Sequence, residues 1–215
     1  MRTVLALAAL AALTVCNTAP IKPDFGLKVG NVWTYGQTSD GNNVTITQTA
    51  LRFVEVKPQT HALEVKAEYS GGYEGYLYFG QNEEGFLSYF NSEMRGPGVD
   101  RQSAPILLAK MPFTKGLAWT WSEPFRGQTS GEVTQRDLDR MTTHKTANIV
   151  SENEKVTVPA GTYRTVHIRV HAESEASGAR TEDHWFAFGV GLVKSSYTTD
   201  GRATERVLMA FTPGK

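Results

Sequence analysis

The strongest constraint on the fold of this chain is a strict alternation of apolar and polar residues in short segments. Apolar and charged side chains alternate through residues 63–69, and residues 166–170 repeat the pattern, with Val166, Ile168 and Val170 on one side. Successive side chains of a β-strand point to opposite faces of the sheet. Each segment therefore predicts a strand with one buried face and one face in water.

Further segments have the apolar or aromatic content of strands, and turn-forming residues such as Gly71-Gly72 and Asp200-Gly201 separate them. These segments are residues 44–56, 73–79, 86–90, 119–122, 145–151, 181–188, 192–198 and 204–211. Short strands that alternate with tight turns favour antiparallel pairing. The sequence thus predicts an all-β or mainly β fold, an antiparallel curved sheet in the form of an open barrel or a sandwich, with at most one or two short helices.

Two segments do not show this alternation. Residues 104–111 place apolar side chains next to each other, so we expect either a short helix that starts at Pro105 or a buried edge segment. Residues 134–143 are mostly polar, and we interpret them as a long hairpin with weak patterning.

The two halves of the chain share landmarks in the same order. A glycine, two further residues, Trp-Thr and an aromatic residue occur at residues 30–35 and again at 116–121. Later in each half a strand ends in Phe-Gly, at Phe79 and Phe188, and another glycine with two apolar residues follows. Chance matching of aromatic strands is the alternative. We expect two similar β units within a single domain of residues 25–215, at about residues 30–92 and 116–198.

The N-terminal segment, residues 1–16, has the features of a signal peptide. Arg2 supplies a positive charge, and an almost unbroken apolar run of thirteen residues extends from Thr3 to Val15. A permanent transmembrane helix needs about 20 apolar residues, so the run is too short to span a membrane. Residues 17–24 contain two prolines and no periodic pattern, and we interpret them as a tether.

Cys16 is the only cysteine of the chain and directly follows the apolar run. Residues 13–16, Leu-Thr-Val-Cys, resemble a bacterial lipobox, although Val15 stands where that motif has Gly, Ala or Ser. Lipidation of Cys16 would anchor the protein firmly, because two or more acyl chains bind a bilayer stably. The alternative is cleavage by the ordinary signal peptidase. Both routes predict an exported protein of the cell envelope, either a membrane-anchored lipoprotein or a periplasmic or secreted protein.

The charged residues balance, since lysine plus arginine and aspartate plus glutamate each number 22. A neutral chain has no overall field that attracts nucleic acid or an anionic membrane surface. We therefore expect no nucleic-acid partner, and membrane contact only through an N-terminal lipid anchor at Cys16.

Three motifs occur together in the mature part of the chain. They are Gly30-x-x-Trp33-Thr34-Tyr35, the turn at residues 158–163 and the stretch Phe-Gly-Val-Gly-Leu-Val-Lys at residues 188–194. In combination they resemble a family of bacterial exported proteins and lipoproteins of unknown function, the TapB-like proteins. In that family a proline often precedes the first glycine of the last motif, and Phe188 replaces it here. The resemblance implies an envelope location and a β-rich fold, and it brings no established catalytic residues.

The glycine-rich stretch at residues 188–194 does not fit a nucleotide site. A dinucleotide-binding loop needs G-x-G-x-x-G between a strand and a helix, and Lys194 takes the place of the third glycine. We predict that residues 184–198 form two strands joined at the glycines, with no helix after Lys194. No other pattern calls for a cofactor, so we expect none.

The histidines do not predict a metal site. In a strand His167 and His171 lie about 13 Å apart, and Arg169 stands between them on the same face. We expect this face to be polar and solvated. Residues 182–184, Glu-Asp-His, remain a candidate for a bound cation or a general base.

The strand at residues 73–79 is apolar on both faces, with Tyr76 and Tyr78 on one and Leu77 and Phe79 on the other. A strand buried on both faces needs a cover on the second face. That cover is the other β unit, through core packing, or a bound ligand or partner. The predicted ligand-binding residues are Tyr76, Tyr78, Trp33 and Trp119.

These features favour a non-enzymatic envelope protein that binds an apolar small molecule, a lipid or an envelope protein. Two other classes stay open. One is a hydrolase of envelope polymers that uses a carboxylate pair or Asp183-His184, and the other is a structural or assembly factor. The sequence contains no G-x-S-x-G nucleophile motif, so we assign no catalytic residue.

Overall fold

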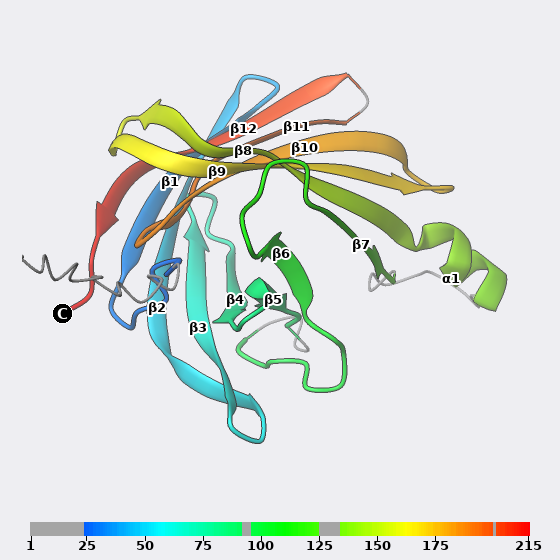
Figure 1. The fold of residues 1–215 in the computed structure, drawn as a ribbon, viewed down its shortest axis with the longest axis horizontal. Coiled ribbons are helices and arrows are strands. Elements are labelled where there is room, and N and C mark those ends of the chain that lie inside the picture. The colour runs from blue at the N-terminus through cyan, green and yellow to red at the C-terminus, as the bar shows by residue number, and fades with distance from the viewer. Residues whose placement is uncertain (1–23, 92–95, 125–133, 200) are drawn as a thin grey trace, which may run out of the picture.

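The computed structural model describes residues 24–91, 96–124, 134–199 and 201–215, and the mainly β prediction is confirmed (Figure 1). The signal peptide and Cys16 lie outside the described residues. The described part contains twelve strands and one short helix, α1 (Gln135–Met141). The strands are β1 (Val32–Ser39), β2 (Asn42–Lys57), β3 (Thr60–Tyr69), β4 (Glu74–Gln81), β5 (Gly85–Tyr89), β6 (Ile106–Lys110), β7 (Ala118–Glu123), β8 (Thr143–Val158), β9 (Gly161–Ser174), β10 (Gly178–Ala187), β11 (Gly191–Thr199) and β12 (Arg202–Thr212).

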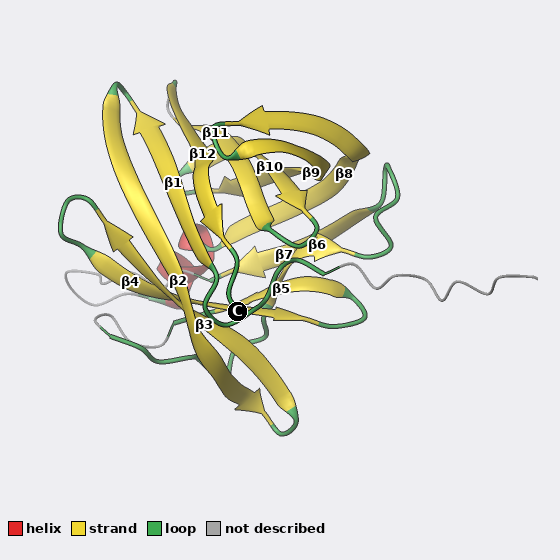
Figure 2. Cartoon of the chain, turned by 90° about the vertical axis from the view of Figure 1, so that its left-hand side faces the viewer, coloured by secondary structure: helices red, strands yellow, loops and turns green. Residues whose placement is uncertain are grey.

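All twelve strands belong to one antiparallel sheet, in the order β6-β5-β4-β3-β2-β1-β12-β11-β10-β9-β8-β7. The sheet curls so far that it forms a nearly closed barrel, as Figures 1 and 2 show. Its two edges are β6 and β7, and the indole Nε1 of Trp119 in β7 donates to the carbonyl oxygen of Leu107 in β6 at 2.8 Å. The open-barrel form of the predicted fold is therefore the one that the chain adopts.

Each half of the chain supplies six consecutive strands. Strands β1–β6 form one meander and β7–β12 form the other, and the two meanders join where β1 pairs with β12. The two shared tryptophans occupy the first strand of each half, Trp33 in β1 and Trp119 in β7. This arrangement agrees with two similar β units, while a repeat in the sequence itself stays a prediction.

The helix predicted to begin at Pro105 is wrong, and the buried edge alternative is correct. Residues 106–110 form the edge strand β6, which pairs with β5. The register shifts so that Ala109 faces Phe86 and Leu107 faces Leu87, which leaves Leu108 without a counterpart. An extra residue of this kind is a β-bulge, and it explains why apolar residues follow one another without alternation.

The hairpin predicted for residues 134–143 is also wrong at its start, because Gln135–Met141 forms α1. A capping box begins the helix: the side chain of Thr134 accepts from the backbone N–H of Asp137, and the carboxylate of Asp137 accepts from the backbone N–H of Thr134. This pairing satisfies two backbone N–H donors at the start of α1, which favours a helix there over a hairpin. Among the described residues, no helix is long and apolar enough to cross a membrane.

The glycine-rich stretch joins two strands, as predicted. Strand β10 ends at Ala187 and β11 begins at Gly191, without a helix after Lys194. Gly189 and Gly191 have φ values of 76° and 95°, in the left-handed region that favours glycine. The turn also contacts the start of the described chain: the backbone N–H of Gly189 donates to the carbonyl oxygen of Asp24 at 2.6 Å.

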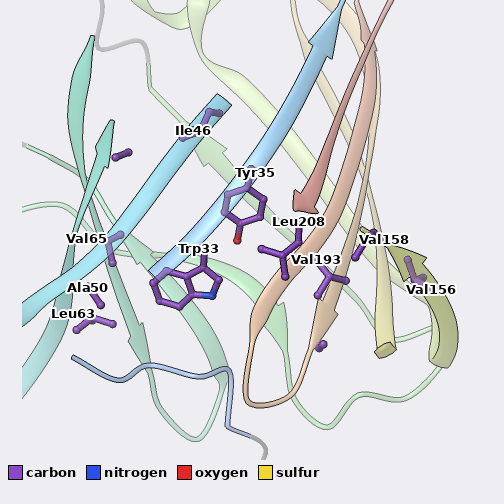
Figure 3. Packing of buried hydrophobic residues seen from close by; sticks show 12 residues of the cluster. Trp33, Tyr35, Ile46, Ala50, Leu63, Val65, Val156, Val158, Val193 and Leu208 are labelled. Atoms are coloured by element: carbon purple, nitrogen blue, oxygen red, sulfur yellow. The ribbon is translucent and has the colours of Figure 1, made fainter. Parts of the chain in front are cut away.

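Phe25, near the start of the described chain, packs between the two halves. Phe25 is only 1% exposed, and its ring stacks on Phe86 of β5 with centroids 4.9 Å apart. It also meets Phe186 of β10 edge to face. A neighbouring cluster contains Trp33 and Tyr35, which Figure 3 shows beside Leu208 and Val193. Aromatic packing therefore fills the barrel near the turn between β10 and β11.

Candidate binding cavity inside the barrel

The concave face of the sheet lines a partly open cavity of about 270 Å³. Both halves of the chain contribute to its wall. The apolar side chains of the wall include Phe25, Leu27, Trp33, Leu77, Phe79, Phe86, Leu108, Phe186 and Leu192. The charged ones are Glu123, Lys145, Glu182, His184 and Arg206.

Strand β10 shows how the sequence separates these two kinds of side chain. Glu182, His184 and Phe186 follow one another at every second position, so all three point into the barrel. Phe186 lies next to the turn that packs on Phe25, whereas Glu182 lies further along the strand. The cavity thus has an aromatic end, formed by Phe25, Phe79, Phe86 and Phe186, and an ionic end, formed by Glu123, Lys145, Glu182, His184 and Arg206.

The rings of the aromatic end hold one another in place. The ring of Phe86 stacks on Phe79 with centroids 5.4 Å apart and meets Phe186 edge to face at 5.7 Å. Such aromatic pairs contribute beyond their buried area, by about 0.5–1.5 kcal/mol each. Strands of both halves therefore present one continuous apolar wall.

Two aromatic residues with polar atoms line the cavity, and the polar atom of each forms a hydrogen bond with the backbone. The indole Nε1 of Trp33 donates to the carbonyl oxygen of Val190 at 2.6 Å, and the hydroxyl of Tyr35 donates to the carbonyl oxygen of Leu192 at 2.9 Å. Burial raises the pKa of Tyr35, although the charge of Arg206 acts in the opposite direction. Both side chains are thus neutral and contribute mainly apolar surface.

Glu182 is the centre of an ion-pair network at the ionic end. Its carboxylate accepts from Arg180 Nε at 2.8 Å and lies 3.3 Å from His184 Nε2 and 3.8 Å from Lys145 Nζ. Lys145 also pairs with Glu123 at 3.1 Å. Burial alone would raise the pKa of Glu182, but its hydrogen bonds from His184 and Arg180 and the charge of Lys145 lower it to about 2. Glu182 is therefore ionised at neutral pH.

Arg206 is the exception at this end, because its guanidinium meets a neutral partner. Its Nε and Nη2 donate to Gln37 Oε1 at 3.1 and 2.7 Å. The adjacent carboxylate, Glu205, pairs with Lys194 at 2.6 Å. Within the part of the chain that the structure describes, no carboxylate lies within ion-pair distance of Arg206. Arg206 thus places an unbalanced positive charge in the cavity wall.

Gln48 is a second polar side chain of the wall with an unusual environment. It is only 8% exposed and lies opposite Trp33 in the β1–β2 pair. No described residue forms a hydrogen bond with its side-chain amide. Because Gln48 lines the cavity, its amide is accessible from there and offers a polar group to water or a ligand.

The predicted ligand-binding residues do not all reach the cavity. Trp33 lines it, whereas Trp119 is 7% exposed and closes the barrel edge instead. Tyr76 and Tyr78 lie on the opposite face of β4 from Leu77 and Phe79, which line the cavity. The hydroxyl of Tyr78 donates to Glu64 Oε2 at 3.3 Å. Sequence periodicity separates the two faces of β4 but does not tell which one is the interior.

The Asp183-His184 pair considered for a hydrolase is not formed. The two side chains point to opposite faces of β10, because they are adjacent in a strand. The carboxylate of Asp183 lies 2.8 Å from His167 Nε2 and accepts from Arg169 Nε at 2.9 Å. His184 instead contacts Glu182. These contacts leave Asp183 and His184 in separate networks.

The solvated face predicted for β9 is wrong at His167. This residue is 7% exposed, its ring stacks on Trp185 at 4.3 Å, and its Nδ1 lies 3.0 Å from Glu154 Oε2. Side chains of neighbouring strands cover it, which the pattern of β9 alone cannot reveal. Arg169 and His171 are exposed as predicted. In the described residues no three His, Cys, Asp or Glu side chains gather in a way that could hold a metal ion.

Known proteins resemble this chain in part of the sequence and in the fold. Residues 128–206 match the model of the DUF3108-like family. This family has no assigned function, and the match covers less than half of the chain. It includes α1 and strands β8–β11, which supply Lys145, Glu182 and His184. The finer resemblance to TapB-like proteins stays a prediction, and no curated protein matches the chain.

Two solved structures from bacteria have a similar fold. One is a candidate exported protein with a YmcC-like fold from Bacteroides fragilis NCTC 9343, with 11% identity and a TM-score of 0.50, covering 88% of this chain and 97% of its own. The other is a candidate lipoprotein from Parabacteroides distasonis ATCC 8503, with 14% identity and a TM-score of 0.49, covering 88% of this chain and 99% of its own. At 11% identity the likeness to the Bacteroides protein concerns the fold alone.

Proposed function

We propose that this chain is an exported protein of the cell envelope that binds an apolar small molecule inside its barrel without transforming it. The cavity of about 270 Å³ carries the proposal, because its wall is aromatic at one end and ionic at the other. A barrel whose role was only structural would gain stability by filling this space with side chains.

The size of the cavity suits a small apolar ligand. An engineered apolar cavity of about 150 Å³ already binds benzene, and pockets for drug-sized molecules have about 300–1,000 Å³. The barrel cavity, at about 270 Å³, lies between these cases. It fits a single acyl chain or a compact hydrophobic molecule better than a two-chain lipid.

The ionic end favours binding over hydrolysis. A hydrolase with a carboxylate pair needs one carboxyl group whose pKa is raised, so that it can donate a proton. The cavity wall contains Glu123 and Glu182, and the pKa of Glu182 is lowered to about 2. Since Glu182 is ionised at neutral pH, it serves as the partner of basic side chains and not as an acid.

The envelope location is supported by the signal-peptide pattern at residues 1–16 and by the exported Bacteroides protein of similar fold. We include lipidation of Cys16 in the proposal. Mass spectrometry of the mature N-terminus tests it: an acylated Cys16 is expected, and a free N-terminus beyond Cys16 would contradict the anchor while leaving export intact.

Binding inside the barrel can be tested with the neutral fluorescent probe N-phenyl-1-naphthylamine. We expect the purified protein to bind it with a rise in fluorescence. Leu77 lines the cavity, so Leu77→Trp should fill part of the space and weaken binding about tenfold or more. Leu51→Trp is the matched control, because Leu51 is 39% exposed and lies outside the cavity. Absence of binding to the unchanged protein, or equal loss in both variants, would overturn the proposal.

A further inference from the structure

The charges at the ionic end of the cavity are unevenly matched. Both carboxylates of the wall have basic partners, since Lys145 pairs with Glu123 at 3.1 Å and with Glu182 at 3.8 Å. Glu182 has a further partner in Arg180. A cationic ligand would therefore compete with side chains that already neutralise these carboxylates.

Arg206, unlike the two carboxylates, has no partner of opposite charge among the described residues. Only Nε and Nη2 have a partner among the described residues, and that partner is the uncharged amide oxygen of Gln37. A guanidinium carries five N–H donors in a plane and binds carboxylates and phosphates with two parallel hydrogen bonds. Arg206 therefore has the donors and the charge to bind an acidic group that enters the cavity.

The strand register places Arg206 where a ligand head group would lie. Arg206 is opposite Gln37 on one side and Ser195 on the other, and Ser195 is opposite His184. His184 in turn is two residues from Phe186 of the aromatic end, so an acyl chain can run from this row along the barrel axis onto the phenylalanines.

We propose that the ligand of the cavity is a single-chain amphiphile with an anionic head group, which pairs with Arg206 while its tail contacts Phe79, Phe86 and Phe186. This inference rests on the proposed function and adds the chemical class of the ligand. The small volume of the cavity favours one chain, and a guanidinium whose partner among the described residues is only the neutral Gln37 selects an acidic head over a neutral or cationic one.

A ligand series on the unchanged protein tests the head group directly. Decanoate, decanol and methyl decanoate have the same chain length and differ at the head, and calorimetry or displacement of the fluorescent probe gives their affinities. We expect decanoate to bind about 10- to 100-fold more tightly than decanol, as charge-assisted hydrogen bonds require. Decyl phosphate, measured alongside, distinguishes a phosphate head from a carboxylate head.

Variants of Arg206 locate the interaction. Arg206→Gln should remove the preference for decanoate and leave the affinity for decanol nearly unchanged. Arg206→Lys should keep part of the preference, which separates the charge from any loss of folding. Arg202→Gln is the matched control on the same strand, because the side chain of Arg202 is 74% exposed and pairs with Asp40 at 3.2 Å.

The outcomes separate the two proposals. Equal affinity for decanoate and decanol would overturn the anionic head group and leave apolar binding intact. A preference for decanoate that persists in Arg206→Gln would overturn the role of Arg206. Failure of decanoate, decanol, methyl decanoate and the fluorescent probe to bind the unchanged protein would overturn the proposed function itself.

Discussion

At the scale of single residues, the cavity wall contains polar groups in three different states. The carboxylate of Glu182 has several basic partners. The guanidinium of Arg206 has a neutral partner, Gln37, and the side-chain amide of Gln48 has no hydrogen-bond partner among the described residues. Each state has a distinct energetic consequence. A paired carboxylate stabilises the fold when ionised, a guanidinium without an acidic partner attracts an anion, and an amide that faces an apolar cavity without a protein partner is partly desolvated at a cost in free energy. The first and third can be measured as protein stability.

Glu182 should make the stability of the protein depend on acid pH. Its folded pKa of about 2 lies below its ordinary value of 4.5, so ionised Glu182 contributes stability above pH 4.5 that is lost as the pH falls towards 2. We expect Glu182→Gln to lower the free energy of unfolding by about 3 kcal/mol at pH 7. The difference from the unchanged protein should shrink to near zero at pH 2.

Urea denaturation at several pH values measures this difference. Glu175→Gln is the control, because Glu175 pairs with Arg140 through side chains that are 72% and 55% exposed, and such surface pairs contribute little. A loss in Glu182→Gln that stays constant between pH 7 and pH 2 would mean that packing, not charge, is responsible.

Gln48 should cost some stability in the empty barrel, because its amide faces the mainly apolar cavity without a partner among the described residues. Methionine has a similar length and no polar atoms to satisfy, so Gln48→Met removes the unpartnered amide without leaving a hole. We expect an increase in the free energy of unfolding of about 1 kcal/mol, or roughly 2–4 °C in the melting temperature. Gln102→Met on the exposed surface is the control. A lower melting temperature for Gln48→Met would show that a bound water or molecule already satisfies the amide.

At the scale of strands and helices, the sequence predicts an element well where one of its faces is inside the barrel and the other is in water. Strands β3 and β9 have that environment only in part: Glu68 and Arg169 are exposed, but Glu64 and His167 on the same faces are buried. The alternation of apolar and polar residues identifies both strands all the same. For strand β6 the sequence leaves a helix and an edge segment open, because a bulge leaves Leu108 without a counterpart and breaks the period of two. The start of α1 is missed although Thr134 and Asp137 carry the spacing of a capping box. That signal is present in the sequence.

The site is harder to predict than the elements, for a physical reason. Strand β4 is apolar on both sides, so its pattern gives no sign that Leu77 and Phe79, rather than Tyr76 and Tyr78, face the cavity. The partners of Glu182 and Arg206 come from other strands, and only the strand order brings them together. Nothing local marks Arg206 as the charged group without an acidic partner. The lack of an acidic partner can be recognised only when the positions of all neighbouring strands are known.

At the scale of the whole molecule, two six-stranded meanders close a barrel that still has two edges. Pairing of β1 with β12 joins the meanders on one side, and Phe25 contacts strands of both halves inside. On the other side the edges β6 and β7 are linked by the bond from Trp119 to Leu107. Bringing the two edges together shields their unpaired backbone N–H and C=O groups, which could otherwise pair with a strand of another chain. The hydrogen bond from Trp119 should therefore stabilise the fold and hold together the side of the barrel at which β6 and β7 meet.

Trp119→Phe should loosen this side of the barrel. The substitution keeps an aromatic ring but removes the indole N–H, and it leaves the carbonyl of Leu107 without its donor. Trp185→Phe is a matched control, because the indole N–H of Trp185 is buried without a partner. Both variants lose part of a ring, and Trp185→Phe also removes a buried donor that has no partner. The extra loss of free energy of unfolding in Trp119→Phe should therefore be at least the roughly 1 kcal/mol of one hydrogen bond. Hydrogen exchange should quicken in β6 and β7 of Trp119→Phe and stay unchanged there in Trp185→Phe. Equal destabilisation of both variants, with unchanged exchange at the two edges, would mean that backbone packing alone holds the barrel closed.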